Sequence, residues 1–382
     1  MKSDKLLSKQ QGIIITINVR WWNAEAAYAI NLARGLIIKG YRVWLIVNNK
    51  SPVHFKALNY DIPVFTDVEL DSYSLIKQIS NLRKLLNYID LYHIKVIHSF
   101  KSNGSFLFSF LRYFKPELIH IRTRGEARPP KKHFLNRRSY GKKACDGVIA
   151  VGDIVKSWII DLNAKIDHLE TIYYADSAVQ FQPDLRRQDH QLFKNLSLDT
   201  IAIALVGRTQ DIKGHQKALK ALAKLNDLNV HLFFLVKDLD EFPNELISLK
   251  QFIKTKQLTD KVTITDFLPD LGNVLSMVDF GIIPSLASEV NCRVAVEFFS
   301  LGKPIIVFPT GSLPEVVKHH VSGLVCADKT SESLAEAIQI LAANCELRTK
   351  LAENAILEYQ SRFSLSILAE KTLNFYRVCA GQ

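Results

Sequence analysis

Short apolar runs alternate with amphipathic segments along the chain. In the first half the runs are 12–18, 41–47, 95–100, 117–123 and 146–151. Each is almost continuously apolar, as expected for parallel strands that are covered by helices on both faces of a sheet. Segments 24–39 and 73–92 between them repeat apolar residues at helical spacing. This half is therefore predicted to form one doubly wound α/β sheet.

The same pattern restarts after a polar stretch, 175–190, that contains Pro183 and is the expected linker. The second set of runs is 200–208, 229–236, 261–267, 279–285 and 303–309. We expect two Rossmann-like domains, 1–180 and 181–360, and a C-terminal helix in 361–382 that packs back on the first domain. The two sheets should face each other across a cleft, with ligands at the carboxyl ends of the strands.

Length and cysteine usage fit an intracellular protein with two domains. A chain of 382 residues is too long for one ordinary core. Its five cysteines show no CxxC or Cys/His spacing, which argues against a disulfide framework or a zinc site. Residues 1–12 lack the apolar segment of a signal peptide, and no apolar run is long enough to cross a bilayer. We expect a cytoplasmic protein, at most peripheral to the inner face of a membrane.

The basic excess lies in the first half. Residues 1–187 carry 29 Lys and Arg against 16 Asp and Glu, whereas 188–382 carry 20 against 22. The excess is densest in 112–143, with 11 basic and 2 acidic residues, directly after the aromatic segment 104–114. Such a patch suits nucleic acid, anionic lipid or a phosphorylated substrate, and a solvated face without a partner is an equally good interpretation. Contact with an anionic membrane is a hypothesis; most of the phenylalanines in 104–114 are more simply assigned to the core.

The stretch ALVGRTQDIKGHQKAL (204–219) is the first candidate for chemistry. A strand ends at Gly207, and a helix is predicted to begin near Lys213. Arg208 and Lys213 then lie at the carboxyl end of a strand, beside a helix N-terminus that favours anions. A forked cation and a point charge suit a diphosphate. Ordinary surface loops also show this pattern.

The second candidate is the region 284–317. Glu289 lies in the loop after a strand, and Glu297 lies two turns into a predicted helix, 291–301. Asn291 and Cys292 present backbone N–H groups at the start of that helix, a second anion site. Two carboxylates near a cleft could act as the acid and nucleophile of a glycosidase. The basic surroundings instead favour ionised carboxylates that accept hydrogen bonds from sugar or ribose hydroxyls, and either glutamate alone would be assigned to a solvated surface.

Four motifs follow in order: Gly-Arg…Lys-Gly, Glu-x7-Glu, GSLPE (311–315) and SGLVC (322–326). Together they resemble the retaining, nucleotide-sugar-dependent glycosyltransferases of family 4, which have the two-domain GT-B fold. The resemblance is close over about 200–341 and weaker over the first half. It implies that Arg208 and Lys213 hold the donor diphosphate, that Glu297 binds the ribose and that Glu289 faces the donor sugar.

The resemblance also implies further positions around the donor. Thr310 and Gly311 correspond to residues near the phosphates, the turn at Phe267 lies near the base, and Gly207 closes the strand before the cations. The chain departs from the family at two places. It has Asn291-Cys292 where Phe-Gly or a similar pair is usual, and Gly311-Ser312 where Gly-Gly is frequent. Both changes alter the wall around the sugar and remove no charged group.

The first half is expected to bind the acceptor. His98, at the end of a strand, resembles a histidine that the family places near the donor sugar, although a local hydrogen-bonding role is the alternative. Arg124 and Glu126 follow the next strand and are acceptor-site candidates, against a plain basic loop. The segment Trp21-Trp22-Asn23 occupies the turn where the family has glycines, and flat rings there would stack on sugar faces.

These features predict a cytoplasmic glycosyltransferase that moves a sugar, with retention, from a nucleotide diphosphate to a hydroxyl of a lipopolysaccharide or other surface glycan. No metal or other cofactor is expected, and glycan or glycolipid acceptors are the expected partners. The alternatives are a sugar-nucleotide epimerase on the same fold, a nucleic-acid-binding protein that uses the basic half, and a non-catalytic scaffold. Nucleic acid is not favoured, since no recognisable reading module is present.

Overall fold

The computed structural model describes residues 8–72, 74–266, 268–287 and 289–381. The chain divides into two compact units. Unit 1 is Met1–Asp176 together with Arg362–Gln382, and unit 2 is Ser177–Ser361. The C-terminal helix thus belongs to the unit that contains the N-terminal sheet.

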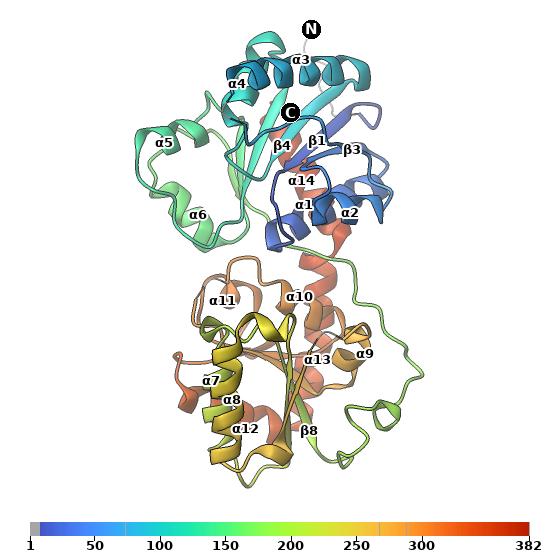
Figure 1. The fold of residues 1–382 in the computed structure, drawn as a ribbon, viewed down its shortest axis with the longest axis vertical. Coiled ribbons are helices and arrows are strands. Elements are labelled where there is room, and N and C mark those ends of the chain that lie inside the picture. The colour runs from blue at the N-terminus through green and yellow to red at the C-terminus, as the bar shows by residue number, and fades with distance from the viewer. Residues whose placement is uncertain (1–7, 73, 267, 288, 382) are drawn as a thin grey trace. The chain divides into compact units, whose positions relative to one another are not determined.

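Unit 1 is built on a parallel sheet of seven strands in the order β3-β2-β1-β4-β5-β6-β7 (Figure 1). The strands are β1 Gly12–Ile17, β2 Arg42–Val47, β3 Val64–Phe65, β4 Ile94–Ser99, β5 Ile119–Arg124, β6 Gly147–Ala150 and β7 Leu169–Thr171. The helices are α1 Ala24–Ile38, α2 Pro52–Leu58, α3 Leu75–Tyr92, α4 Ser105–Phe114, α5 Phe134–Tyr140, α6 Asp153–Ile160 and α14 Leu365–Cys379.

Helices cover both faces of this sheet, because nearly all strand positions are apolar. On one face, Ile14, Ile46 and Ile97 pack with Leu85 of α3 and Phe108 of α4. Helices α1 and α14 pack against each other (Figure 1), and α14 also contacts β5.

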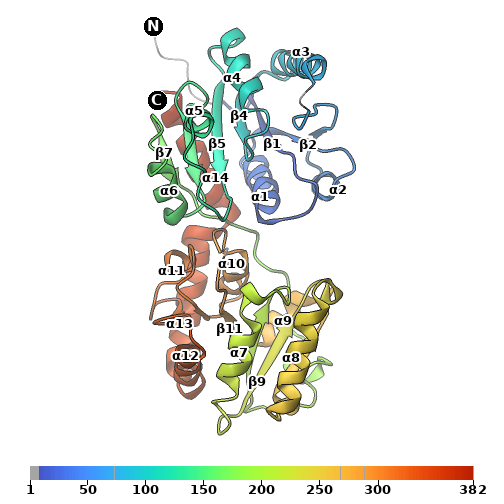
Figure 2. The same ribbon diagram turned by 60° about the vertical axis from the view of Figure 1, so that its left-hand side comes forward.

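Unit 2 contains a parallel sheet of six strands in the order β10-β9-β8-β11-β12-β13. The strands are β8 Ile201–Val206, β9 Val230–Leu235, β10 Val262–Thr265, β11 Phe280–Ile283, β12 Ile305–Val307 and β13 Gly323–Val325. The helices are α7 His215–Leu222, α8 Pro243–Thr255, α9 Leu271–Met277, α10 Arg293–Ser300, α11 Leu313–Val316, α12 Ser331–Ala343 and α13 Cys345–Glu358. Figure 2 shows α7 and α8 side by side, and both contribute to the core with α12.

Both sheets have the predicted doubly wound architecture, and every predicted apolar run contains a strand. Strands β3, β7 and β13 were not predicted, since each has only two or three residues at or near a sheet edge. The strand order reverses between β1 and β4 in unit 1 and between β8 and β11 in unit 2. Ligands of such sheets bind at these reversals, beyond the carboxyl ends of the strands.

Helix α4 differs from its expected packing. Of its four phenylalanines, Phe108 is buried, whereas Phe106, Phe110 and Phe114 are exposed. The assignment of most of them to the core is therefore wrong, because Leu107, Phe108 and Leu111 already fill the inward face. Across the described residues, no helix combines the length and apolar character needed to cross a bilayer.

Candidate active site

Three loops of unit 2 meet at the carboxyl edge of its sheet, next to the reversal of strand order. They are 207–214 after β8, 284–292 after β11 and 308–312 after β12. Every donor-site residue predicted from the motifs lies on these loops or in α10, except Phe267, which lies outside the described residues.

Two glycines hold the middle loop from either side. Gly214 and Gly311 have φ values of 79° and 56°, in the left-handed region that favours glycine. A Cβ atom at Gly214 would overlap the carbonyl oxygen of Pro284, and one at Gly311 would overlap that of Glu289. The backbone N–H of Ser312 donates to the same Glu289 carbonyl at 2.7 Å. Only glycine allows the outer loops to approach this closely.

Hydrogen bonds fix the rest of the middle loop. The Leu286 N–H donates to the Ile212 carbonyl at 2.8 Å, and the Thr310 hydroxyl donates to the Ser285 carbonyl at 2.6 Å. Thr310 is buried, so its side chain organises the loops. These bonds connect the described parts of the three loops to one another.

Lys213 and Glu289, predicted to contact the donor diphosphate and the donor sugar, lie next to each other. The Lys213 ammonium forms an ion pair with Glu289 Oε1, and the Ser285 hydroxyl donates to the same oxygen at 2.8 Å. Glu289 is largely buried, while Lys213 is partly exposed. The ammonium is therefore held at the edge of the site, where a second anion can share it.

Arg208 lies at the surface of the same edge, and its side chain is 44% exposed. Its Nε and Nη1 atoms each lie 3.2 Å from a carboxylate oxygen of Glu241. Exposed pairs of this kind are weak, so an incoming phosphate can take over the guanidinium. The sequence did not indicate Glu241 as a partner.

Glu297 lies in α10 and is mostly buried. Arg293, one turn earlier, donates from Nε to Glu297 Oε1 at 2.7 Å. This pairing orients the carboxylate. Arg293 was missed because a basic residue at i−4 on a helix surface is a common pattern without functional meaning.

The start of α10 differs slightly from its prediction. The helix begins at Arg293 and not at 291, and Cys292 precedes it in a left-handed conformation with φ of 48°. Burial, reinforced by the nearby Glu289 and Glu315 carboxylates, raises the pKa of the Cys292 thiol well above its usual value. The thiol stays neutral, so Cys292 and the nearly buried Asn291 can contribute packing and backbone groups but no thiolate.

His98 is not open to solvent, which corrects the expectation that it lies within reach of a substrate. The side chain is fully buried, and its ring nitrogens lie 2.6 Å from the Tyr376 hydroxyl and the Thr123 hydroxyl. Burial lowers the pKa of His98 to about 3. The structure supports the alternative role, a neutral local hydrogen-bonding residue.

Arg124 and Glu126 form a charged network with residues that the sequence did not indicate. Arg124 is buried and lies 2.9 Å from Glu126 Oε2, and it also donates to the Tyr140 hydroxyl at 2.8 Å. Lys101, after β4, pairs with both Glu126 and the buried Glu25. The Arg124 side chain is thus bound by groups within unit 1, while the Glu126 side chain remains exposed.

The turn after β1 presents its two tryptophans differently. Trp21 is 68% exposed, and Trp22 is half-buried. Asn23 caps α1 by accepting a hydrogen bond from the Ala26 N–H at 2.9 Å. Its local role is therefore to start the helix and fix the turn that carries the rings.

Two family models match the chain, one in each unit. Residues 187–358 match the model described as glycosyl transferases group 1. Residues 26–174 match the model described as glycosyltransferase family 4.

Curated relatives match parts of the chain. The alpha-D-kanosaminyltransferase of Streptomyces kanamyceticus is 25% identical over 198 residues, 51% of this chain and 50% of the relative. The D-inositol 3-phosphate glycosyltransferase of Mycobacterium marinum is 26% identical over 266 residues, 67% of this chain and 55% of the relative. The chain therefore spans about half the length of these relatives.

Solved structures match over nearly the whole chain. A glycosyltransferase from Rickettsia africae ESF-5 has a TM-score of 0.85 at 18% identity, covering 97% of this chain and 99% of its own. Anabaena Alr3699/HepE, solved in complex with UDP-glucose, has a TM-score of 0.76 at 16% identity and 97% and 100% coverage. The lipopolysaccharide outer core galactosyltransferase WaaB has a TM-score of 0.69 at 11% identity and 96% and 99% coverage. These likenesses identify the fold as GT-B.

Proposed function

The chain belongs to the glycosyltransferases, with a group 1 unit and a family 4 unit, and from this premise we propose that it transfers a sugar from a nucleotide-diphosphate donor to a hydroxyl acceptor, with retention of configuration. The convergence of Arg208, Lys213 and the start of α10 at one edge of the unit 2 sheet carries the proposal. Fixed cations and helix N–H groups stabilise the charge that develops on a departing diphosphate.

In this proposal the donor diphosphate displaces Glu241 from Arg208 and shares Lys213 with Glu289. Arg208 leaves Glu241 for the phosphate oxygens, and Lys213 bridges the diphosphate and Glu289. Glu289, freed from part of its ion pair, accepts hydrogen bonds from the donor sugar. The departing phosphate assists deprotonation of the acceptor hydroxyl on the same face, and the reaction uses no bound metal.

The remaining donor contacts are assigned from the same loops. Glu297, oriented by Arg293, accepts hydrogen bonds from the ribose hydroxyls. The backbone around Gly311 is assigned to the phosphates from its place at the start of α11, beside the loop that carries Glu289. Asn291 and Cys292 form the wall beside the sugar. The complex of Anabaena Alr3699/HepE with UDP-glucose supports a nucleotide sugar as the donor class.

The acceptor is proposed to be a lipopolysaccharide or another surface glycan or glycolipid, and it is proposed to bind to unit 1. The rings of Trp21 and Trp22 then provide a stacking surface for its sugars, and Glu126 accepts hydrogen bonds from them. The likeness to the galactosyltransferase WaaB supports this class. A glycolipid acceptor also implies that the sugar transfer takes place at the inner face of an anionic membrane.

A panel of nucleotide sugars tests the donor site first. The donor should raise the melting temperature, because it binds the folded state only. Transfer to a glycan acceptor, followed by NMR of the new anomeric centre, then tests retention. The proposal fails if no nucleotide sugar stabilises the protein, or if the sugar is altered without any acceptor, which would indicate an epimerase.

A further inference from the structure

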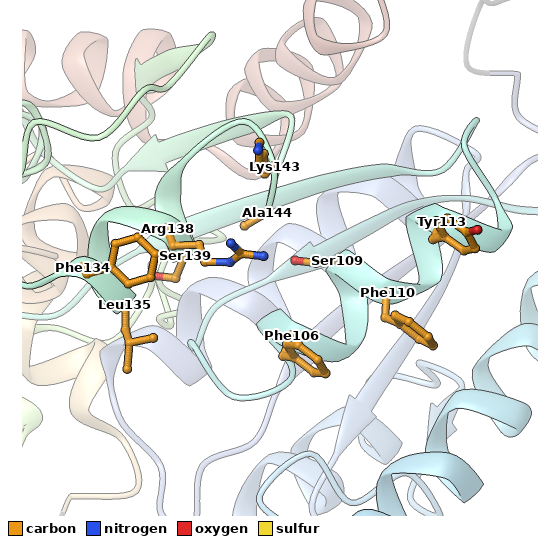
Figure 3. Close-up of a pocket in the computed structure, with 10 residues that line it drawn as sticks. All are labelled: Phe106, Ser109, Phe110, Tyr113, Phe134, Leu135, Arg138, Ser139, Lys143 and Ala144. Atoms are coloured by element: carbon orange, nitrogen blue, oxygen red, sulfur yellow. The ribbon is translucent and has the colours of Figure 1, made fainter.

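A groove of about 710 Å³ lies between α4 and α5 of unit 1 (Figure 3). It is distinct from the loops of the proposed donor site, which all belong to unit 2. Figure 3 shows Phe106 and Phe110 on α4 and Phe134 and Leu135 on α5, with Arg138 between the two helices. The groove therefore has apolar walls and a basic centre.

The apolar walls are unusually exposed. Phe106 is 82% exposed and Phe134 is 71% exposed, and Leu135 and Tyr113 are similarly open. On α4 the rings form an ordered row, since Phe106 stacks with Phe110 at a centroid distance of 6.5 Å and Phe110 stacks with Tyr113 at 6.4 Å. Contiguous apolar surface of this kind marks an interaction site.

The basic residues of 112–143 differ in their partners. Four are bound within unit 1: Arg112 pairs with Asp146, Lys115 pairs with Asp90, Arg124 pairs with Glu126, and Arg122 donates to the Ser139 carbonyl. Arg128 is exposed, and so are six residues of 131–143, of which Arg138 and Lys143 line the groove; the six are Lys131, Lys132, Arg137, Arg138, Lys142 and Lys143. Throughout the described structure, none of these six forms an ion pair, and the segment 127–145 contains no acidic residue.

We propose that the α4–α5 groove docks on an anionic phospholipid bilayer. Headgroup phosphates lie between Arg138 and Lys143, and the rings of Phe106 and Phe134 enter the acyl boundary. Interfacial surfaces combine basic residues with phenylalanine and leucine in this way. The inference rests on the membrane contact that belongs to the proposed function, and it assigns that contact to a specific site.

The chemistry of the groove favours a bilayer over other partners. The unpaired cations, in a segment without acidic residues, call for an anionic partner, and the exposed rings beside them call for an apolar one. A second copy of the chain, docked through the same groove, would bring six unpaired cations of one chain against six of the other. Phosphate headgroups above hydrocarbon satisfy the cations and the rings together.

The test uses the full chain and vesicles of phosphatidylcholine alone or with 30 mol% phosphatidylglycerol, at about 0.15 M salt where long-range attraction is screened. Co-flotation should occur with the anionic vesicles only. Each basic residue near such a surface contributes roughly fivefold to binding, so R138E/K143E should weaken it by about 25-fold or more. The matched control K220E/K254E reverses two exposed lysines of unit 2 and should bind as the wild type does.

The apolar walls need a separate pair of variants. F106S/F134S should weaken binding about tenfold or more by removing inserted rings, whereas L75S/I76S, which removes equally exposed apolar residues of α3, should not. Melting temperatures show that each variant is folded. Failure of the wild type to bind anionic vesicles overturns the inference, and so does equal loss in a groove variant and its control.

Two further outcomes would also overturn it. One is a concentration-dependent dimer, seen by sedimentation velocity without vesicles, that F106S/F134S abolishes. The other is tighter binding to single-stranded nucleic acid than to anionic vesicles at the same salt. The rise in melting temperature on donor addition is measured in parallel. If the protein binds the donor but not the vesicles, the docking site alone is rejected. If it binds the vesicles but not the donor, the proposed donor site alone is rejected.

Discussion

The arginine side chains at the carboxyl edges of the two sheets differ in their exposure and in their partners. In unit 2 the Arg208 side chain is 44% exposed and pairs with a surface glutamate, whereas in unit 1 the Arg124 side chain is 6% exposed and is fixed by Glu126 and Tyr140. The topology of both edges is the same, since each follows a reversal of strand order. A strand end therefore indicates where a ligand can bind, but the exposure of its charges decides whether the residues serve a ligand or the fold.

The sharpest test of this contrast is the loss of a unit 2 cation. Arg208→Ala or Lys213→Ala should lower turnover by roughly 100-fold or more, the range for removal of a preorganised charge contact. The control Lys220→Ala removes an exposed lysine of α7 and should leave turnover unchanged. Steady-state kinetics measures the effect. Near-normal rates in both variants would contradict the proposal that Arg208 and Lys213 bind the donor diphosphate.

The second test addresses the glycines that hold the unit 2 loop. Gly311→Ala should lower the free energy of unfolding by about 2–3 kcal/mol, because it combines a left-handed backbone with overlap on the Glu289 carbonyl. Gly381→Ala has a similar φ of 76° and no atom within 4 Å of the added carbon, so it should cost only about 1 kcal/mol. Chemical denaturation measures the free energy of unfolding of both variants. An equal decrease in the two would show that the loop around Glu289 can shift at little cost to make room for the added carbon.

Acid should destabilise unit 1 through its buried histidines. Burial lowers the pKa of His98 to about 3 and that of His120 to about 4, against an ordinary value of 6.5. The unfolded chain therefore binds more protons below pH 6.5, and stability falls from there down to about pH 4. The slope approaches about 1.4 kcal/mol per pH unit for each histidine. His120→Gln should flatten the slope between pH 6.5 and 5 in denaturation experiments; an unchanged slope contradicts the assignment.

The smallest expected effect concerns the turn after β1. Trp22→Ala should raise the acceptor KM about 2–10-fold with little change in the donor KM, because ring stacking on a sugar contributes modestly. Phe55→Ala, at an exposed aromatic residue of α2, is the control and should change neither constant. A larger change in the donor KM than in the acceptor KM would indicate that Trp22 contacts the donor and not the acceptor.

The fold could be predicted from the sequence because long apolar runs determine buried parallel strands almost by themselves. Strands of two or three residues, such as β13, carry too few positions to show a pattern. In the site, Lys213 and Glu289 could be placed together, since adjacent strands at a reversal bring their loops together. Their surroundings could not: the pairing of Arg208 with Glu241 depends on loop conformation.

The burial of His98 could not be predicted either. It depends on Tyr376 of α14, 278 residues away along the chain, and local sequence does not encode such a contact. The outward rings of α4 show the same limit. The aromatic residues of this segment are plain in the sequence, but only the packing of Leu107 and Leu111 shows which face of the helix the core leaves uncovered.

The two glycines beside the 284–289 loop restrict how the sequence of this protein can vary. A larger residue at 214 or 311 requires the carbonyl of Pro284 or Glu289 to retreat, so such a change needs a second, compensating change elsewhere in the loop. Ser312 has φ of −85°, so another small side chain at this buried position needs no change of the backbone. Directed evolution of the site is therefore best begun at Ser312, and not at either glycine.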